Sequence, residues 1–405
     1  MKRVALVAAV AVGLSLATAG VGQATTRSPG NATAQSSVPL LPRFTVIPPL
    51  QLPTQFAHAV RASRTPPQLP TFTTSYFDGT NTWPATFVGV KPSKHRTTRV
   101  PVQLVALNFT FPYESNYCGV SAPTTLNGTD VVSAVRNSPL FVKNYYHSSL
   151  GDKGLLQFLD AYVRQAFNQQ KTGYHVYLNL NTKVPTLNVE VPFNDGFIGD
   201  GNSCIDRTPT GLAIVDTSFF ISVLDNLLPL TTYLHNNNAL LGLVSRDVVL
   251  ADFAQGLMRN CCILGFHTYY QLPNGRQPLE WASYITDPTF FGPLASDMVA
   301  TSHEVAEFQM DPFLTNATPS WRFPGGPAGD CQSNLEVGDP TEVLSGTPST
   351  FRLTGNSYFQ SAGTDHRWHM VNAVNPSWYF NQSPSTSAGG RYDMNNYFTG
   401  PAQPC

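Results

Sequence analysis

The sequence predicts an α+β fold, a mixed α/β arrangement in which strands and helices do not alternate regularly. Val176, Leu178 and Leu180 share one face of a segment at residues 174–181, which is the period of a half-buried strand. Apolar residues between 152 and 168 instead recur at helical spacing. Because the two patterns do not follow a repeated strand–helix order, a doubly wound sheet is not expected.

The remaining elements follow the same two periodicities. Strands are expected at residues 100–111, 187–191, 212–215 and 262–270, and helices at 217–228 and about 293–310. The two helices end at Pro229 and at Asp311-Pro312, because the residue before a proline disfavours the helical conformation. Past Pro312, clustered Pro, Gly, Ser and Asn predict a loop-rich C-terminal part.

Composition limits the classes of partner. The 405 residues include 24 basic and 25 acidic side chains, a formal net charge of −1. Such a balance gives no reason to expect a nucleic-acid groove. Charged residues make up only 12% of the chain while hydrophobic residues reach 42%. The expected protein is therefore exported, with a large core and a polar, weakly charged surface.

The first residues predict a route out of the cell. Lys2 and Arg3 precede an apolar run that ends near small-residue sites typical of signal-peptidase cleavage, so residues 1–24 are interpreted as a signal peptide. An N-terminal membrane anchor is the alternative. No later segment is apolar over about 18 residues, so no membrane span is expected in the mature chain. Residues 25–70, rich in Ser, Thr and Pro, are expected to form a linker, and residues 71–405 the folded domain.

Six cysteines follow the signal segment, in what is expected to be an oxidising compartment. They allow up to three disulfides, with connectivity open. Cys261 and Cys262 are adjacent, so a bond between them would be strained, and at least one is expected to reach a distant partner.

One segment carries candidate chemistry. His303 and Glu307 are four residues apart on the helix expected at 293–310, so their side chains share one face. Glu304 points about 100° away from His303. This is the logic of H-E-x-x-H, in which two histidines bind zinc and the glutamate is the general base. Here Glu307 replaces the second histidine, which permits Zn²⁺ and also favours Ca²⁺, Mn²⁺ or Mg²⁺.

A third ligand is expected downstream. Glu336 is the first candidate, and Asp339 is expected to orient the His303 ring or to replace a ligand. Asp311 and His267 are alternative ligands, and His369 is a weaker one. The competing interpretation of the motif is a solvated helix face. The flanking Met298, Val299, Val305, Ala306, Phe308 and Met310 argue against it, because a buried helix rarely carries unpartnered charges.

Short blocks in a fixed order carry a family resemblance over about residues 100–405. They are residues 138–141, 156–162, 261–267, 302–307 with Asp311-Pro312, 335–340, and 378–380 with Cys405. With these blocks the chain resembles a family of secreted bacterial zincin-like H-E-x-x-E proteins. More distantly, it is similar to the plant EXORDIUM or phosphate-induced cell-wall proteins, which are apoplastic and linked to growth.

The resemblance implies a zincin-like, metallopeptidase-type domain with a mixed sheet beside the active-site helix. In the gluzincin pattern a downstream glutamate is the third ligand and a nearby aspartate supports the histidine, and Glu336 and Asp339 resemble that pair. The departure from the pattern is Glu307 in the place of a histidine.

Two main hypotheses about function follow. The first is a secreted zinc-dependent hydrolase, peptidase-like, in which Glu304 activates a metal-bound water and the substrate is an unknown protein or cell-wall component. The second is a non-catalytic cell-wall or extracellular protein that keeps the scaffold for structure or recognition. A two-carboxylate glycosidase and a Ca²⁺ loop at residues 194–202 are weaker alternatives.

Overall fold

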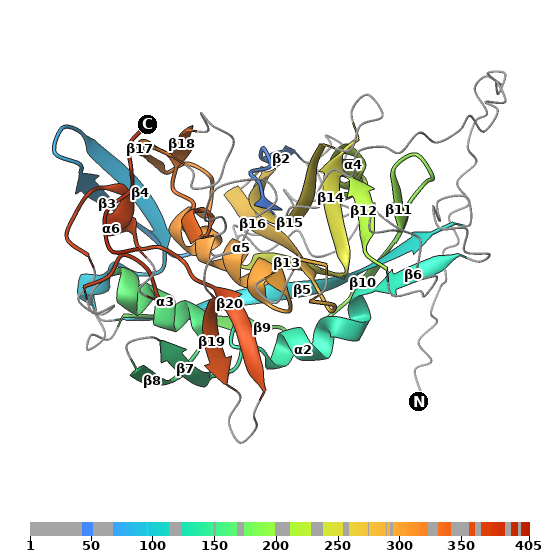
Figure 1. Cartoon of the computed structure of the whole chain (residues 1–405), viewed down its shortest axis with the longest axis horizontal. Coiled ribbons are helices and arrows are strands. Elements are labelled where there is room, and N and C mark those ends of the chain that lie inside the picture. Colours follow the sequence, from blue (N-terminus) through green and yellow to red (C-terminus); the bar gives the residue numbers. More distant parts are fainter. Residues whose placement is uncertain are drawn as a thin grey trace, which may run out of the picture. The chain divides into compact units, whose positions relative to one another are not determined.

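The structure is a computed structural model, shown in Figure 1. It describes residues 43–51, 68–94, 96–112, 123–148, 151–167, 174–198, 211–227, 238–253, 259–273, 275–288, 290–291, 295–322, 331–341, 356–360, 366–384, 390–395 and 398–405. The chain divides into two units, Met1–Ser37 and Val38–Cys405, and every described residue belongs to the second. The expected signal peptide therefore lies outside the described residues. No helix in the described part is long and apolar enough to cross a membrane.

A mixed sheet of 12 strands is the scaffold of the described residues (Figure 1). Its path runs β10-β5-β13-β16-β15-β14-β12-β11, with β6 and β9 paired to β5, and β1 and β2 paired to β15. The strands are β1 (Arg43–Phe44), β2 (Leu50–Gln51), β5 (Thr97–Phe111), β6 (Thr124–Asn127), β9 (His175–Leu180), β10 (Thr186–Glu190), β11 (Gly196–Ile198), β12 (Ala213–Asp216), β13 (Leu240–Arg246), β14 (Val248–Asp252), β15 (Arg259–Leu272) and β16 (Gly275–Tyr284). Strand β13 is parallel to β5, whereas β15 and β16 are antiparallel, which confirms the expected mixture.

Smaller sheets and short helices complete the described structure. The smaller sheets pair β3 (Thr71–Phe77) with β4 (Thr82–Val88), pair β17 (Ala317–Arg322) with β18 (Cys331–Asn334), and join β20 (Arg367–Val371), β19 (Asn356–Gln360), β7 (Asn144–Ser148) and β8 (Gly151–Leu156) in that order. The helices are α2 (Val132–Asn137), α3 (Phe158–Ala166), α4 (Thr217–Leu227), α5 (Val299–Met310) and α6 (Pro376–Tyr379), with 3₁₀ turns η1 (Pro92–Lys94), η3 (Gly128–Val131) and η7 (Asp339–Thr341).

The strands expected from periodicity are present as β5, β9, β10, β12 and β15, and the helix expected at 217–228 is α4. The helix expected from residue 152 is wrong in its first part, because residues 151–156 form β8 and α3 begins at Phe158. Gly154 has a φ of 89°, a conformation that no α-helix contains. Helix α5 begins at Val299, later than the expected residue 293.

The described part of the expected linker pairs with the main sheet. Strands β1 and β2 lie in this segment, and both pair in parallel with β15. Phe44 of β1 lies opposite Gly265, and Leu50 of β2 lies opposite Tyr270. Strand β14 pairs with the start of β15. Ile47 and Leu50 are buried. Residues 43–51 therefore belong to the folded core, because they supply hydrogen bonds and apolar surface to β15.

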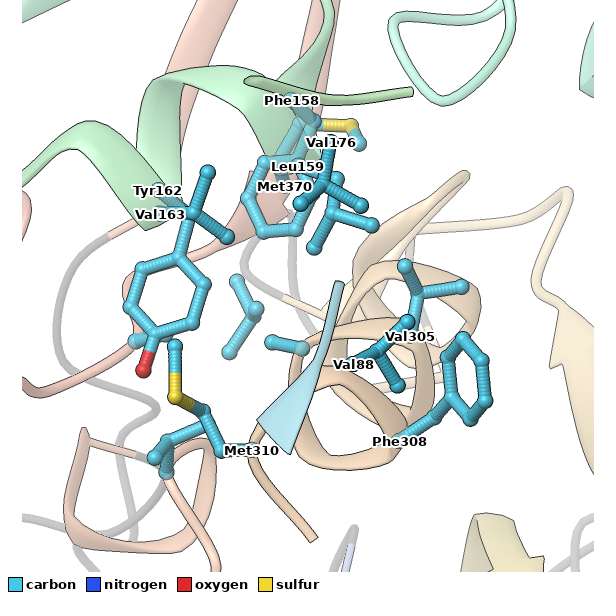
Figure 2. Close-up of a cluster of buried hydrophobic side chains, with 14 of the residues drawn as sticks. Val88, Phe158, Leu159, Tyr162, Val163, Val176, Val305, Phe308, Met310 and Met370 are labelled. Atoms are coloured by element: carbon cyan, nitrogen blue, oxygen red, sulfur yellow. The ribbon is translucent and has the colours of Figure 1, made fainter. Parts of the chain in front are cut away.

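Helix α5 is buried on all sides. It packs against β15 and β16 of the main sheet and also contacts β4, β20 and α3 (Figure 1). Figure 2 shows Val305 and Phe308 of this helix in an apolar cluster with Val88 and with α3. All 12 residues of α5 are buried, so its polar side chains have protein rather than water as their surroundings.

Two disulfides lie within the described residues. Cys331 on β18 bonds to the C-terminal Cys405, with the two Cα atoms 6.0 Å apart and a sequence separation of 74. Cys261 and Cys262 bond to each other at the start of β15, so the expectation of a distant partner is wrong for this pair. Both cysteines are buried side by side at the start of β15, and each is the other's partner among the described residues. Cys118 and Cys204 lie outside the described residues.

Candidate metal centre

The first group of candidate ligands combines α5 with the turn that follows β18. His303 Nε2 lies 2.7 Å from Glu307 Oε1, as the four-residue spacing on a helix predicts. Asp339, the first residue of η7, places Oδ1 3.5 Å from the same His303 nitrogen. One ligand atom from each of these three residues lies within 4.8 Å of the other two. They form one candidate metal site, in which Asp339 is the third ligand. The sequence had favoured Glu336 for that role.

A second group shares Glu307. His267 on β15 places Nδ1 3.2 Å from Glu307 Oε2 and 3.6 Å from Glu304 Oε2, and these atoms also lie within 4.8 Å of one another. The other ring nitrogen of His267 lies 3.2 Å from the backbone oxygen of Asp311. If Nε2 carries the proton and donates it to that carbonyl, Nδ1 presents a lone pair to the two carboxylates. His267 is therefore part of the cluster.

Two further glutamates lie beside these groups. Glu336 is buried and interacts electrostatically with Glu307 and Asp339, and its Oε1 has no hydrogen-bond partner among the described residues. Its backbone oxygen accepts a hydrogen bond from the Tyr379 hydroxyl, which fixes the loop. Glu280 on β16 is the cross-strand partner of His267 and is also buried. Sequence reasoning missed Glu280, and the signal was a single acid within the apolar run Leu279-Glu280-Trp281-Ala282.

The imidazole of His303 is held between two flat surfaces. The ring of Phe44 stacks on it, with centroids 3.6 Å apart and planes 8° apart. On the backbone side, a Cβ atom at Gly338 would collide with the ring. Gly265 leaves room for Glu304 in the same way, since a Cβ atom at Gly265 would lie 2.6 Å from Glu304 Oε1. The two glycines therefore leave just enough room for these side chains.

Burial controls the protonation of the cluster. It raises the pKa of Glu304 to about 8, against the opposing effect of His267. Burial also tends to raise the pKa of Glu307, but His303 and His267 together outweigh this effect and lower the pKa to about 2. Burial raises the pKa of Glu336 and of Asp339, and the charge of Glu307 raises both further. The site thus holds carboxylates whose ionised forms need a positive partner.

Two of the expected ligands have other roles. Asp311 directs its carboxylate to the next turn, where Oδ1 accepts a hydrogen bond from the Thr315 backbone N–H at 2.8 Å and Oδ2 from that of Asn316 at 3.0 Å. His369 Nδ1 pairs with Asp297 Oδ2 at 2.6 Å. The candidate Ca²⁺ loop at 194–202 extends beyond residue 198, where the described segment ends.

Comparisons with protein-family models, with curated proteins and with solved structures gave no significant match. Fold and site therefore define the chain by themselves, as an α+β protein with a buried cluster of histidines and carboxylates. The resemblance to secreted zincin-like proteins stays an expectation.

Proposed function

We propose that this chain is a secreted metal-binding protein and that its metal centre serves a zinc-dependent hydrolase of the peptidase-like kind. The observation that carries the proposal is the grouping of His303, Glu307 and Asp339, three potential ligands that are at most 7% exposed. Three protein ligands with one open position are the usual donor set of a catalytic zinc. The H-E-x-x-E helix beside a mixed sheet supports a zincin-like arrangement.

The chemistry of the donors fits a divalent cation. One imidazole and two carboxylates suit Zn²⁺, and because two of the ligands are carboxylates the site can also bind Mn²⁺ or Ca²⁺. When bound, such an ion supplies Lewis acidity toward a carbonyl or a water. His303 is oriented for this role by Phe44 and by the backbone at Gly338. Export is supported by the Cys331–Cys405 disulfide and by the signal-like first residues.

Glu304 is the residue we assign as general base. It follows His303 directly, it is fully buried, and neither of its carboxylate oxygens accepts a hydrogen bond from the described residues. A bound cation would favour the ionised form of Glu304, and in that form the carboxylate can take the proton of an attacking water. Proton transfer by a positioned side chain contributes about 10²- to 10⁴-fold to a rate.

A second function is favoured by one observation. Phe44 covers His303, and every residue of the two groups is buried. Such enclosure suits a structural ion that ties α5 to β15 and η7 in a non-catalytic extracellular protein. In that case, removal of the metal costs stability while no activity is lost.

Elemental analysis of the purified, disulfide-intact protein tests the proposal. Wild type is compared with His303→Ala and Glu307→Ala, and His369→Ala serves as the matched histidine control outside the cluster. We expect bound zinc in wild type and in His369→Ala and less metal in the other two variants. A folded wild-type protein without metal after Zn²⁺ loading would overturn the proposal. Metal without turnover on denatured proteins or peptidoglycan would favour the structural function.

A further inference from the structure

Glu307 faces two histidines with two different oxygen atoms. Its Oε1 lies 2.7 Å from His303 Nε2, and its Oε2 lies 3.2 Å from His267 Nδ1. The two imidazoles come from different elements, α5 and β15, so this is not a consequence of helical spacing alone. A carboxylate that directs one oxygen to each of two ligand sets has the arrangement of a bridging ligand.

The spacing of the second group fits a shared cation. His267 Nδ1 lies 3.6 Å from Glu304 Oε2 and 3.2 Å from Glu307 Oε2. Direct charge-assisted hydrogen bonds measure about 2.7–2.9 Å, so both distances are long for that interaction. Ligands held about 2.0–2.1 Å from one tetrahedral ion lie about 3.3 Å from each other, which falls between the two observed distances.

Glu304 supplies an independent observation. It is 0% exposed, and neither of its oxygens has a hydrogen-bond partner among the described residues. A buried ionised carboxylate without partners is costly. The Nδ1 atom of His267 lies 3.6 Å from Glu304 Oε2, beyond ordinary hydrogen-bond distance. A cation between the two would satisfy both side chains.

The carboxylates of the whole cluster can balance the charge of two dications. Five buried carboxylates belong to it, namely Glu280, Glu304, Glu307, Glu336 and Asp339. With all five ionised and both imidazoles neutral, the formal charge is −5. One divalent cation leaves −3 and two leave −1. Protonation of the most enclosed carboxyl then gives a neutral site, which a low-dielectric interior tolerates best.

We propose that the cluster binds two divalent cations, with Glu307 as the bridging ligand. The first ion takes His303 and Asp339, and the second takes His267 and Glu304. This inference rests on the metal centre of the proposed function and reassigns Glu304 from base to ligand. The chemical class is a zinc- or manganese-type ion, because each half offers one imidazole together with carboxylates.

Metal stoichiometry tests the proposal directly. The full disulfide-intact protein is stripped with chelator, loaded with Zn²⁺, desalted and analysed for metal per chain. We expect two ions in wild type and in His369→Ala, one in His267→Ala, one in His303→Ala and none in Glu307→Ala. One ion in wild type overturns the second site and leaves the proposed function standing, whereas no ion overturns both. Two ions retained by His267→Ala would also contradict the assignment.

A measurement on wild type alone covers the case in which a variant does not fold. Mn²⁺ is titrated into the stripped protein and followed by electron paramagnetic resonance. Carboxylate-bridged ions lie about 3.5–4 Å apart, so two bound Mn²⁺ ions give an exchange-coupled spectrum. An isolated six-line signal that saturates at one ion per chain would refute the pair, and would place His267 with Glu304 and Glu307 in a metal-free ion-pair cluster.

Discussion

Phe44 lies flat on the imidazole of His303, with ring centroids 3.6 Å apart and an interplanar angle of 8°. The two residues are 259 positions apart in the sequence, and they meet because β1 pairs with β15 and α5 packs against β15. A segment that composition places in a linker thus forms one wall of the candidate metal centre.

Replacement of Phe44 by alanine should open that wall. We expect chelators to remove the metal at least several-fold faster, because solvent gains a path to His303. Lost contact area should cost about 1–2 kcal/mol of unfolding free energy, less than for a fully buried phenylalanine. Metal release to a chromogenic chelator and urea denaturation measure the two effects. Val46→Ala, at a 43% exposed position in the same segment, is the control, and equal release rates in both variants would count against the covering role.

Glu304→Gln separates catalysis from binding at the His303 side of the centre. The amide can neither accept the proton of a water, as the base of the proposed function must, nor bind a second ion as a carboxylate does, so turnover should fall by about 10²-fold or more in either role of Glu304. The ion on His303 and Asp339 should remain, since neither ligand is changed. Activity is measured on whichever substrate wild type cleaves, and metal content on the same sample. Glu190→Gln, an exposed glutamate on β10, is the control, and near-wild-type turnover in Glu304→Gln would exclude this residue as base.

Gly338→Ala should damage the centre through a steric effect alone. The added Cβ meets the His303 ring, and the ring cannot move away because Phe44 occupies its other face. We expect a loss of about 1–3 kcal/mol in stability, as for other overpacked positions, together with weaker metal binding. Gly400→Ala is the matched control, because no atom lies within 4 Å of its added Cβ. Thermal unfolding and a Zn²⁺ titration of both variants decide the matter, and an undisturbed Zn²⁺ affinity in Gly338→Ala would contradict the close fit.

Local pattern was enough to predict much of the scaffold. Alternation located β9 and the long apolar run located β5, since strand periodicity is a property of neighbouring residues. The same local logic failed at residues 151–156, where pairing with β7 and the backbone of Gly154 outweigh helical spacing. The pairing of β1 and β2 with β15 was missed because it depends on a strand more than 200 residues away.

The candidate site divides in the same way. Its helical half, His303 with Glu307, follows from a four-residue spacing that the sequence displays. Asp339 and His267 were among the candidates, but their order of importance depends on how the loop after β18 and strand β15 approach α5. The position of Glu280 beside His267 depends on the antiparallel register of β15 with β16, which no local sequence pattern encodes.

Removal of the metal should reverse the pH dependence of stability. In the stripped protein, burial raises the pKa of Glu304 from 4.5 to about 8, and Glu280 and Glu336 shift upward for the same reason. A carboxyl with a raised pKa binds its proton more tightly in the folded state, so its stabilising effect is lost as pH rises from about 4.5 toward 8. The pKa of Glu307 is lowered to about 2, so this residue changes the stability only at pH values below that range.

We therefore expect the stripped protein to be less stable at pH 8 than at pH 5, by roughly 2–5 kcal/mol. The loaded protein should show the opposite slope, because a cation displaces the protons and binds more tightly as pH rises. Urea unfolding of both forms at pH 5, 6.5 and 8 measures the two slopes. His369→Ala should keep the sign of both slopes, because its side chain pairs with Asp297 outside the cluster. A stripped protein that gains stability from pH 5 to pH 8 would show that the buried carboxylates are neutralised by protein groups alone, and no cation would then be required.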